Sequence, residues 1–328
     1  MNYSHTLGVD IAKAKFDVAL HAARSDTNTR KDKCAVFANN PAGFESLLQW
    51  LAKHSVALDS VHVAMEATGI YYEQLAQFLC AKGLAVSVIN PSRISGFAQA
   101  NLSRTKTDKA DAKLIARYCD ALQPALWLAP SPHVHHLREL TRRLADLKDL
   151  QQQESSRLPL AHATHDSVAA IIGAIEAQIN LVNQAIKDHI DKHPDLKEQA
   201  RLLNTIPGVG VVTIGTLLAE VEFERFERAA HLAAFTGLAP KISESGTSLH
   251  SRGRLSKTGS STLRRSLYMP AIVAMQHNSV IKTFYQRLLA NGKSKMQAVC
   301  ACMRKLLCIA FGVLKSKRAF DPNYAISA

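Results

Sequence analysis

Four carboxylates stand where their side chains could share one chemical task. Asp10, in GVDIAKAKFDV, and Glu66, in VAMEATG, each lie at the end of an apolar, strand-like run. Asp108 and Asp111 lie three residues apart in the helical pattern TDKADAKLIARYC, so both project from one helix face. Convergent oxygen ligands select a hard divalent cation, Mg²⁺ or Mn²⁺, and such a cluster at strand ends suits metal-assisted phosphoryl transfer on nucleic acid.

Each acid also has a plain structural interpretation. A single strand-borne Asp is commonly a cap, an ion-pair partner or a solvated group. Asp108 and Asp111 could stabilise a helix N-terminus, which is worth about 0.3–1 kcal/mol for each charge. Like charges one turn apart repel, however, and a bound cation would explain their spacing. We interpret Asp17 and Asp120 as solvated.

Alternating strands and helices position these acids. Residues 5–22 alternate apolar and polar and, with the second run CAVFANN (34–40), predict a β-hairpin that opens a sheet. Thr107 is the predicted N-cap of the helix that carries Asp108 and Asp111 in its first turn. A hairpin followed by alternating elements predicts an α/β domain with a mixed sheet and helices packed on its faces. The further predicted elements are a helix at 41–54, a strand at 60–69, a helix at 71–83, a strand at 84–91, and helices at 94–102 and 107–119.

The pattern changes to long helices beyond Pro124, Pro130 and Pro132. Two apolar stripes, separated by Pro159, predict a helical hairpin or coiled-coil arm that mediates self-association. The alternative is an ordinary packed helix pair inside a globular domain. The stripes consist of Leu137, Leu140, Leu144, Leu147 and Leu150, and of Val168, Ile171, Ile172, Ile175, Ile179, Val182, Ile186 and Ile190.

A glycine-rich turn, IPGVG at 206–210, separates two further apolar helical runs. It has the form of a helix-hairpin-helix. In such a turn Gly208 and Gly210 would let the backbone approach a phosphate, and the following helix would supply N–H donors. Turns of this kind also connect helices that bind no ligand.

Positive charge gathers in the C-terminal part of the chain. The net charge is +13, and residues 201–328 hold 18 Lys or Arg against 6 Asp or Glu. No acidic residue lies between Ser245 and Phe320. This balance indicates a surface that faces a polyanion such as nucleic acid. A membrane-facing surface is the alternative, but no helix shows the amphipathic division of an interfacial anchor.

The polar loop from Lys241 to Ser256 is a second place for chemistry. Its cations could hold a scissile phosphate and stabilise charge that develops near a hydroxyl. A serine hydroxyl needs activation, and no His or Lys base is evident from the sequence, so activation by the metal cluster is an option. The candidate hydroxyls are Ser243, Ser245, Thr247, Ser248 and Ser251, and the candidate phosphate-binding cations are Lys241, Arg252, Arg254, Lys257, Arg264 and Arg265.

Cysteine usage and hydropathy indicate the compartment. The six cysteines form no CxxC pair and lie mostly among apolar neighbours, which is typical of reduced core residues in a cytosolic protein. His133, His135 and His136 lie beside two prolines, and we interpret them as an exposed linker or helix start rather than a metal site. No signal pattern opens the chain, and no apolar run approaches the roughly 18 residues needed to span a bilayer. We therefore expect a cytoplasmic protein with no membrane partner.

Several motifs, in order along essentially the whole chain, resemble those of the DEDD-type insertion-sequence transposases. That family is related to the Piv-type DNA invertases, and its members are described as bridge-RNA-guided recombinases. The motifs are GVDIAKAKFDV, the MEATG strand end, VINP, TDKADA, IPGVG, FTGLAP, ESG and SKTGSSTLRRSLYMPA.

The resemblance implies a domain organisation. Residues 1–125 would form a RuvC-like (ribonuclease H-like) catalytic domain that binds metal. Residues 126–198 would form a helical, coiled-coil arm. Residues 199–328 would form a basic, mostly helical transposase domain that holds the helix-hairpin-helix and the serine loop.

The resemblance also implies the site residues and the partners. The four acidic positions of the family fall on Asp10, Glu66, Asp108 and Asp111, and its nucleophilic serine falls on Ser245 in the ESG motif. The implied partners are donor and target DNA and a non-coding guide RNA that the element encodes. The implied assembly is a dimer that becomes a tetramer in synapsis, in a bacterial protein that acts at the nucleoid.

We therefore expect a site-specific DNA recombinase of a mobile element. The carboxylates would bind Mg²⁺ or Mn²⁺, and Ser245 would form a covalent serine–DNA intermediate. One alternative is a junction-type nuclease in which the same acids activate water. The other is a non-enzymatic nucleic-acid-binding scaffold whose acids are structural. Covalent trapping separates the first two, and metal-dependent strand cleavage separates both from the third.

Overall fold

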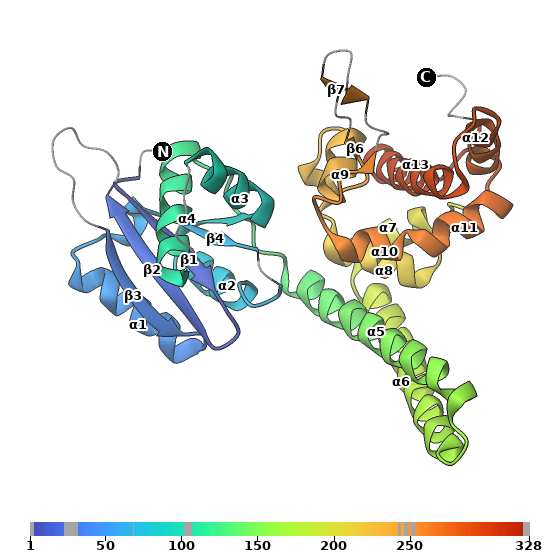
Figure 1. Cartoon of the computed structure of the whole chain (residues 1–328), viewed down its shortest axis with the longest axis horizontal. Helices are drawn as coiled ribbons and strands as arrows, with labels where there is room; N and C mark the ends of the chain where they lie inside the picture. Colours follow the sequence, from blue (N-terminus) through green and yellow to red (C-terminus); the bar gives the residue numbers. More distant parts are fainter. Residues whose placement is uncertain are drawn as a thin grey trace. The chain divides into compact units, whose positions relative to one another are not determined.

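The computed structural model divides the chain into two compact units, residues 1–129 and residues 130–328, both drawn in Figure 1. Each unit has its own buried apolar core. The three-part division implied by the resemblance stays a prediction. The structure describes residues 3–22, 32–67, 69–101, 107–241, 244–245, 249–250 and 254–323, and only the backbone of residues 244, 245, 249, 250 and 254.

A mixed sheet forms the centre of the first unit. Its strands are β1 (His5–Ile11), β2 (Lys15–Ala22), β3 (Lys33–Ala38), β4 (Val61–Glu66) and β5 (Ala85–Ile89). Their order is β3-β2-β1-β4-β5. β2 is antiparallel to both of its neighbours, and β4 is parallel to both of its own. The mixed sheet predicted from the sequence is confirmed, and its strand order fits a ribonuclease H-like domain.

The first hairpin differs from the prediction. Residues 5–22 form two strands, β1 and β2, rather than one, because the chain reverses at Ala12–Ala14. The turn is closed by the Ala12 amide, which donates to the Lys15 carbonyl at 2.9 Å. Small and polar residues alternate through this turn without Gly or Pro, so the alternating pattern continues across it and hides the reversal. The reversal pairs Asp10 directly with Asp17.

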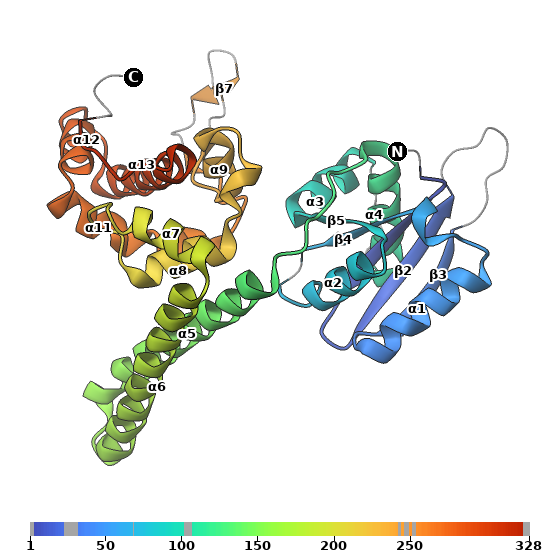
Figure 2. The same ribbon diagram turned by 180° about the vertical axis from the view of Figure 1, so that it is seen from behind.

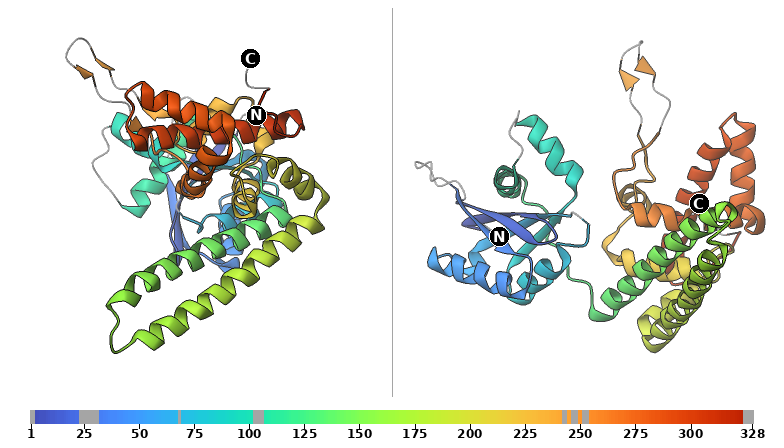
Figure 3. Two further views of the ribbon diagram at one scale, coloured as in Figure 1. Left: turned by 90° about the vertical axis from the view of Figure 1, so that its right-hand side faces the viewer. Right: turned by 60° about the horizontal axis from the view of Figure 1, so that its bottom comes forward.

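Helices cover both faces of the sheet, as the right-hand view of Figure 3 shows. The helices are α1 (Pro41–Lys53), α2 (Glu73–Ala81), α3 (Pro91–Ala100) and α4 (Asp108–Leu122). α1 and α2 bury their apolar sides against one face, and α3 and α4 cover the other. α1 and α3 each begin at an Asn-Pro pair, in which the Asn40 or Asn90 side chain accepts a backbone N–H of the first turn. The predicted helices are confirmed.

The second unit is helical and is seen from behind in Figure 2. Two long helices, joined by the short η2 (Leu158–Leu160), lie side by side as an antiparallel hairpin, as the left-hand view of Figure 3 also shows. Several of the remaining helices pack against the apolar helix α13. The elements are α5 (Pro132–Arg157), α6 (His165–Lys192), α7 (Pro194–Leu203), α8 (Val211–Glu220), η3 (Phe223–Arg225), α9 (Ala229–Phe235), α10 (Ser261–Ser266), α11 (Tyr268–His277), α12 (Ser279–Ala290) and α13 (Lys295–Ser316).

The predicted polar loop contains short strands. β6 (Pro240–Lys241) pairs with β9 (Arg254–Leu255), and β7 (Glu244–Ser245) pairs with β8 (Leu249–His250). Both pairs are antiparallel, so the segment runs out and back. Ser245 pairs with Leu249 in the outer of the two ladders.

Within the residues that the structure describes, two helices are long and apolar enough to cross a membrane by length and composition alone. This differs from the expectation that no apolar run is long enough. Half of the apolar window of α13 is buried inside the second unit, as in a core helix, whereas only 6% of the α6 window is buried. One or two such helices are weak evidence for a membrane span, since core helices pass the same test. The uncovered apolar side of α6 therefore needs another explanation.

Candidate active site

One face of the sheet, the face that α4 covers, carries the predicted acid Asp10. Alternate residues of a strand point to the same face, so Thr6, Gly8 and Asp10 share a side of β1. The Thr6 hydroxyl donates to the Ala116 carbonyl of α4 at 3.1 Å. A Cβ at Gly8 would overlap the backbone of α4 at Ala112 and Ala116, so only glycine lets the helix lie this close. We call this surface the α4 face.

Two neighbouring strands bring further carboxylates to the same end of the α4 face. Asp17 on β2 is the direct cross-strand partner of Asp10, and directly opposed residues point to the same side. On the other side of β1, Val9 pairs with Met65 of the parallel strand β4. Asp10 is the next residue after Val9, and Glu66 is the next residue after Met65. Both acids therefore lie side by side at the carboxyl ends of adjacent parallel strands.

The first turn of α4 supplies the other two predicted acids. Thr107 caps this helix, and its hydroxyl accepts from the Ala110 amide at 3.2 Å, which confirms the predicted N-cap. Asp108 and Asp111 lie in the first turn. Because Gly8 and Thr6 hold the body of α4 against β1, that turn is directed to the end of the strand where Asp10 lies.

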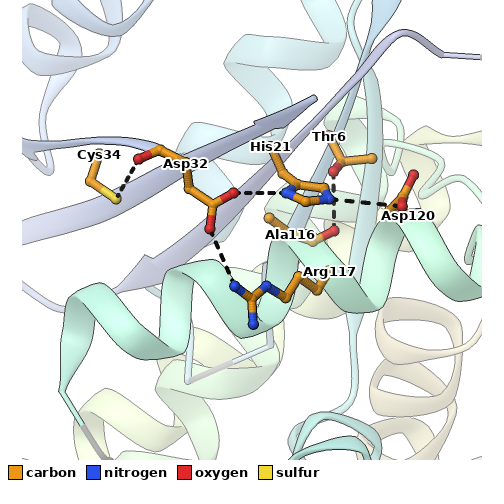
Figure 4. Close-up of polar contacts among 7 residues, drawn as sticks. All are labelled: Thr6, His21, Asp32, Cys34, Ala116, Arg117 and Asp120. Atoms are coloured by element: carbon orange, nitrogen blue, oxygen red, sulfur yellow. Dashed lines mark hydrogen bonds and ion pairs between the residues drawn. The ribbon is translucent and has the colours of Figure 1, made fainter. Parts of the chain in front are cut away.

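A polar network fixes α4 against β2, as Figure 4 shows. His21 Nδ1 lies 2.7 Å from Asp32 Oδ1, and the second oxygen of Asp32 lies 3.7 Å from the Arg117 guanidinium. The other ring nitrogen of His21 lies 3.9 Å from Asp120 Oδ2. Asp120 therefore has a partner in the fold. The network ties the C-terminal half of α4 to the sheet and so contributes to the placement of its first turn.

The electrostatics of Asp10 show that the four predicted acids act on one another. Burial and the nearby charges of Asp111, Asp108, Glu66 and Asp17, in that order, raise the pKa of Asp10 from 3.8 to about 6. Nearby positive charges would lower this pKa, and distant charges would leave it unchanged. The structure therefore brings together the four acids that the sequence singled out.

Lys15 and Asp17 belong to the same cluster, and the sequence interpretation missed both. The Lys15 ammonium donates to Asp108 Oδ2 at 2.8 Å and to Asp17 Oδ2 at 3.1 Å. The hydrogen bond with Lys15 lowers the pKa of Asp108, and those with Asp108 and Asp17 raise the pKa of Lys15. Asp17 is buried, so its interpretation as solvated was wrong. Its pairing with Asp10 depends on the turn that the alternating pattern hid.

The donor set of this cluster fits a hard divalent cation. Every donor is a carboxylate oxygen, and the raised pKa of Asp10 reports negative charge that a cation would offset. As the side chains stand, no three His, Cys, Asp or Glu residues in the described part of the chain are arranged to hold a metal ion. Asp108 is instead paired with the ammonium of Lys15 at 2.8 Å.

The predicted residues of the serine loop are only partly described. Ser245 lies in β7 and Arg254 in β9, both with backbone alone, and Arg252 lies outside the described residues. The side chain of Lys257 is exposed. The hydroxyl predicted as the nucleophile is therefore placed only by the course of its strand.

Arg264 and Arg265 have partners within the second unit. The Arg264 guanidinium donates to the Thr236 and Gly259 carbonyls at 3.1 and 3.0 Å. Arg265 forms an ion pair with Asp149 of α5. Both side chains thus have partners in their own unit, and their predicted contact with nucleic acid stays a prediction.

The glycine-rich turn packs against α11. Gly208 has a φ of +99°, and a Cβ there would meet the backbone and Cβ of Ala274 at 2.7–2.9 Å. Gly210 is the residue before α8 and has open space around it. An apolar hollow of about 400 Å³ lies beside both glycines, lined in part by Met269, Pro270 and Val273. Packing therefore explains Gly208, and phosphate binding at this turn stays a prediction.

A histidine cluster joins the base of α5 to that of α6. His133 stacks on His193, His193 lies beside His189, and His189 lies beside His136, with ring centres 4.4–5.0 Å apart. A ring nitrogen of His189 lies 2.8 Å from the His133 carbonyl. Burial is the largest effect on His189 and lowers its pKa. HVHH is the start of a helix, as predicted, and its rings pack against a second helix.

A sheet of this strand order, with acids at the carboxyl ends of its central strands and on a flanking helix, defines a class of enzymes that process nucleic acids. Residues 7–160 match the family model of the DEDD transposases of the IS110 type, described as "Transposase". Residues 200–286 match the model of the "Transposase IS116/IS110/IS902 family". The chain belongs to this transposase family and is a DNA recombinase or transposase.

Relatives that match over nearly their whole length support this assignment. The "Pilin gene-inverting protein" of Moraxella bovis is 34% identical, over 96% of this chain and 97% of its own length. The protein of the same name from Moraxella lacunata is equally similar. The "Transposase for insertion sequence element IS1328" of Yersinia enterocolitica is 23% identical over 96% of this chain and 98% of its own.

Proposed function

We propose that the protein cuts and rejoins DNA at specific sites, with Asp10, Glu66, Asp108 and Asp111 holding Mg²⁺ or Mn²⁺. The observation that carries this proposal is the placement of Asp10 and Glu66 at the ends of adjacent parallel strands, with Asp108 and Asp111 in the first turn of the helix that covers them. Burial and the neighbouring carboxylates together raise the pKa of Asp10, which supports it. When bound, the cation would neutralise charge on the phosphate that is attacked. The chain's own residues hold the acids on the α4 face and direct the first turn of α4 to them.

The proposed nucleophile is Ser245. Its oxygen forms a bond to phosphorus, the phosphorus–oxygen bond to the departing strand breaks, and the hydroxyl proton ends on the departing oxygen. The reverse reaction with a new strand rejoins the DNA and frees the serine. Support comes from the ESG motif and from the cation-rich segment around it, where a phosphate would find partners such as Lys257.

The proposed partners are donor and target DNA and a guide RNA that the element encodes. Exposed cations on α12 and α13, among them Lys282, Arg287 and Lys295, add to the basic balance of the second unit and support nucleic-acid binding there. The resemblance of the whole chain to the DEDD transposases supports the guide RNA. A helix-hairpin-helix at IPGVG, with Gly208 and Gly210 near a phosphate, is part of the same proposal.

The proposed α5–α6 arm mediates assembly into dimers and, in synapsis, tetramers. Recombination of two duplexes requires four strand breaks, so several catalytic sites must meet. On the arm Leu150, Leu160, Ile171 and Leu181 expose 42–79% of their surface, so large apolar side chains remain uncovered within the chain. A partner helix from a second copy would cover it as in a coiled coil. The proposed domains are a catalytic domain at 1–125, the arm at 126–198 and a transposase domain at 199–328. The proposed place of action is the bacterial cytoplasm.

Covalent trapping tests the proposed chemistry. Labelled target DNA is mixed with protein, Mg²⁺ and the element's RNA and resolved on a denaturing gel. The wild type should give a protein-linked band that Ser245→Ala and Asp10→Ala each reduce by a factor of about 10³ or more, because nucleophile and acids act in one step. Ser245→Ala should still bind DNA, and Ser243→Ala in the same loop is the matched control.

Two outcomes would contradict this chemistry. Full recombination without any trapped band, or a band that persists in Ser245→Ala, would favour the nuclease in which the acids activate water. Strand cleavage that needs no divalent metal would remove the role of the acids, and the absence of any cleavage would favour the scaffold.

A further inference from the structure

An ammonium group stands among the carboxylates at the end of the α4 face. Lys15 is the first residue of β2, and its Nζ lies 2.8 Å from Asp108 Oδ2 and 3.1 Å from Asp17 Oδ2. Both of these carboxylates also act on Asp10, since their charges raise its pKa. The ammonium of Lys15 thus lies where the negative charge of five acids gathers.

Folding stability is a poor explanation for this contact. The side chains of Lys15 and Asp108 are 48% and 59% exposed. Exposed ion pairs contribute little to stability, because water screens them and two long side chains lose freedom. Lys15 on β2 and Asp108 on α4 lie far apart in the sequence. They meet because β2 and α4 come together at this site, so the contact belongs to the site.

We propose that Lys15 holds the place of a divalent cation in the acidic site. The ammonium neutralises Asp108 and Asp17 while no metal is bound, and it releases Asp108 when the cation arrives. Lys15 is then a positioning residue, which keeps the first turn of α4 near Asp10 in the metal-free protein. This inference rests on the metal site proposed above.

Competition between the two cations has consequences that can be measured without DNA. Because the ammonium and the metal both use Asp108, removal of the ammonium should raise the affinity for metal. The metal-free protein should change little in stability, since the exposed pair of Lys15 and Asp108 contributes little to it. Added metal should therefore raise the melting temperature more in a variant without Lys15 than in the wild type.

Calorimetric titration of the full-length protein with Mn²⁺ tests this inference. Lys15→Met should bind Mn²⁺ at least about fivefold more tightly than the wild type, because even two unit charges a few ångström apart interact by about 1 kcal/mol in water. Lys15→Arg, which keeps the charge, should stay within about twofold. Lys13→Met removes an equal charge from the exposed turn just before β2 and is the matched control; it should also stay within about twofold. Lys15→Gln repeats the test if the methionine variant does not fold.

The possible failures can be told apart. Unchanged or weaker Mn²⁺ binding by both neutral Lys15 variants would overturn the inference, as would an equal gain in Lys13→Met. If the wild type binds no Mn²⁺, or Asp10→Asn binds it as tightly, the metal site itself is overturned and the role of Lys15 with it. Binding that depends on Asp10 but not on Lys15 would overturn the role of Lys15 alone.

Discussion

At the scale of single residues, Asp10 is an acid whose ionisation depends strongly on its surroundings. Its pKa of about 6 in the folded chain lies above the ordinary value of 3.8. A carboxyl whose folded pKa is raised costs no stability while both states keep it protonated. The cost appears as the pH rises from about 4 to about 6 and is complete above that range. At neutral pH without metal, Asp10 therefore destabilises the fold.

Asp10→Asn should consequently stabilise the metal-free protein at neutral pH. The gain should be about 1–2 kcal/mol, after allowance for the solvent that screens a half-exposed group. Thermal unfolding in a chelating buffer should show this gain at pH 7.5 and a smaller one at pH 5. Added Mg²⁺ should reverse the order, because it stabilises only the carboxylate form. If the Asn variant is less stable than the wild type at pH 7.5, the Asp10 carboxylate does not destabilise the folded protein.

At the scale of elements, the contact of α4 with β1 determines where two of the four acids lie. Gly8→Ala would place a methyl group on backbone atoms of Ala112 and Ala116, which cannot move aside without the whole helix. We expect a loss of about 1–3 kcal/mol in unfolding free energy and weaker Mn²⁺ binding, because Asp108 and Asp111 move with the helix. Chemical denaturation and metal titration check both effects. Gly173 in α6 has open space around it, so Gly173→Ala should lower neither the unfolding free energy nor the affinity for Mn²⁺. Unchanged metal binding in Gly8→Ala would show that the position of α4 does not matter for the metal site.

At the scale of the whole molecule, the uncovered apolar side of the arm decides how copies of the chain associate. Ile171 and Leu181 are 46% and 62% exposed in the single chain. Replacing both by Glu should convert the oligomer to monomers, because buried carboxylates cost more than the apolar contact contributes. Light scattering measures the mass, and the melting temperature should change little. Val36→Glu, at a 56% exposed position on β3, is the control, and an unchanged mass in the double variant would show that the arm packs only within its own chain.

Local patterns in the sequence determined much of this protein. The helices and most strands of the first unit followed from periodicity and caps, as at Thr107 and at the two Asn-Pro pairs, because these signals act within a few residues. The four acids were found because each stands at the end of a periodic run. Family motifs then joined them to a transposase, which the comparisons confirm.

Only the tertiary structure decided which side chains share the site. Lys15 and Asp17 join it because the chain reverses at Ala12–Ala14, a turn without Gly or Pro that the alternating pattern conceals. Gly208 lies against α11, and Arg264 holds two backbone carbonyls, contacts that no local pattern announced; phosphate binding by either residue stays a prediction. The reason is physical: a periodic pattern reports which side of an element is buried, whereas cross-strand and helix–sheet contacts join residues far apart in the chain. The charge balance of the acidic site depends on contacts of that second kind.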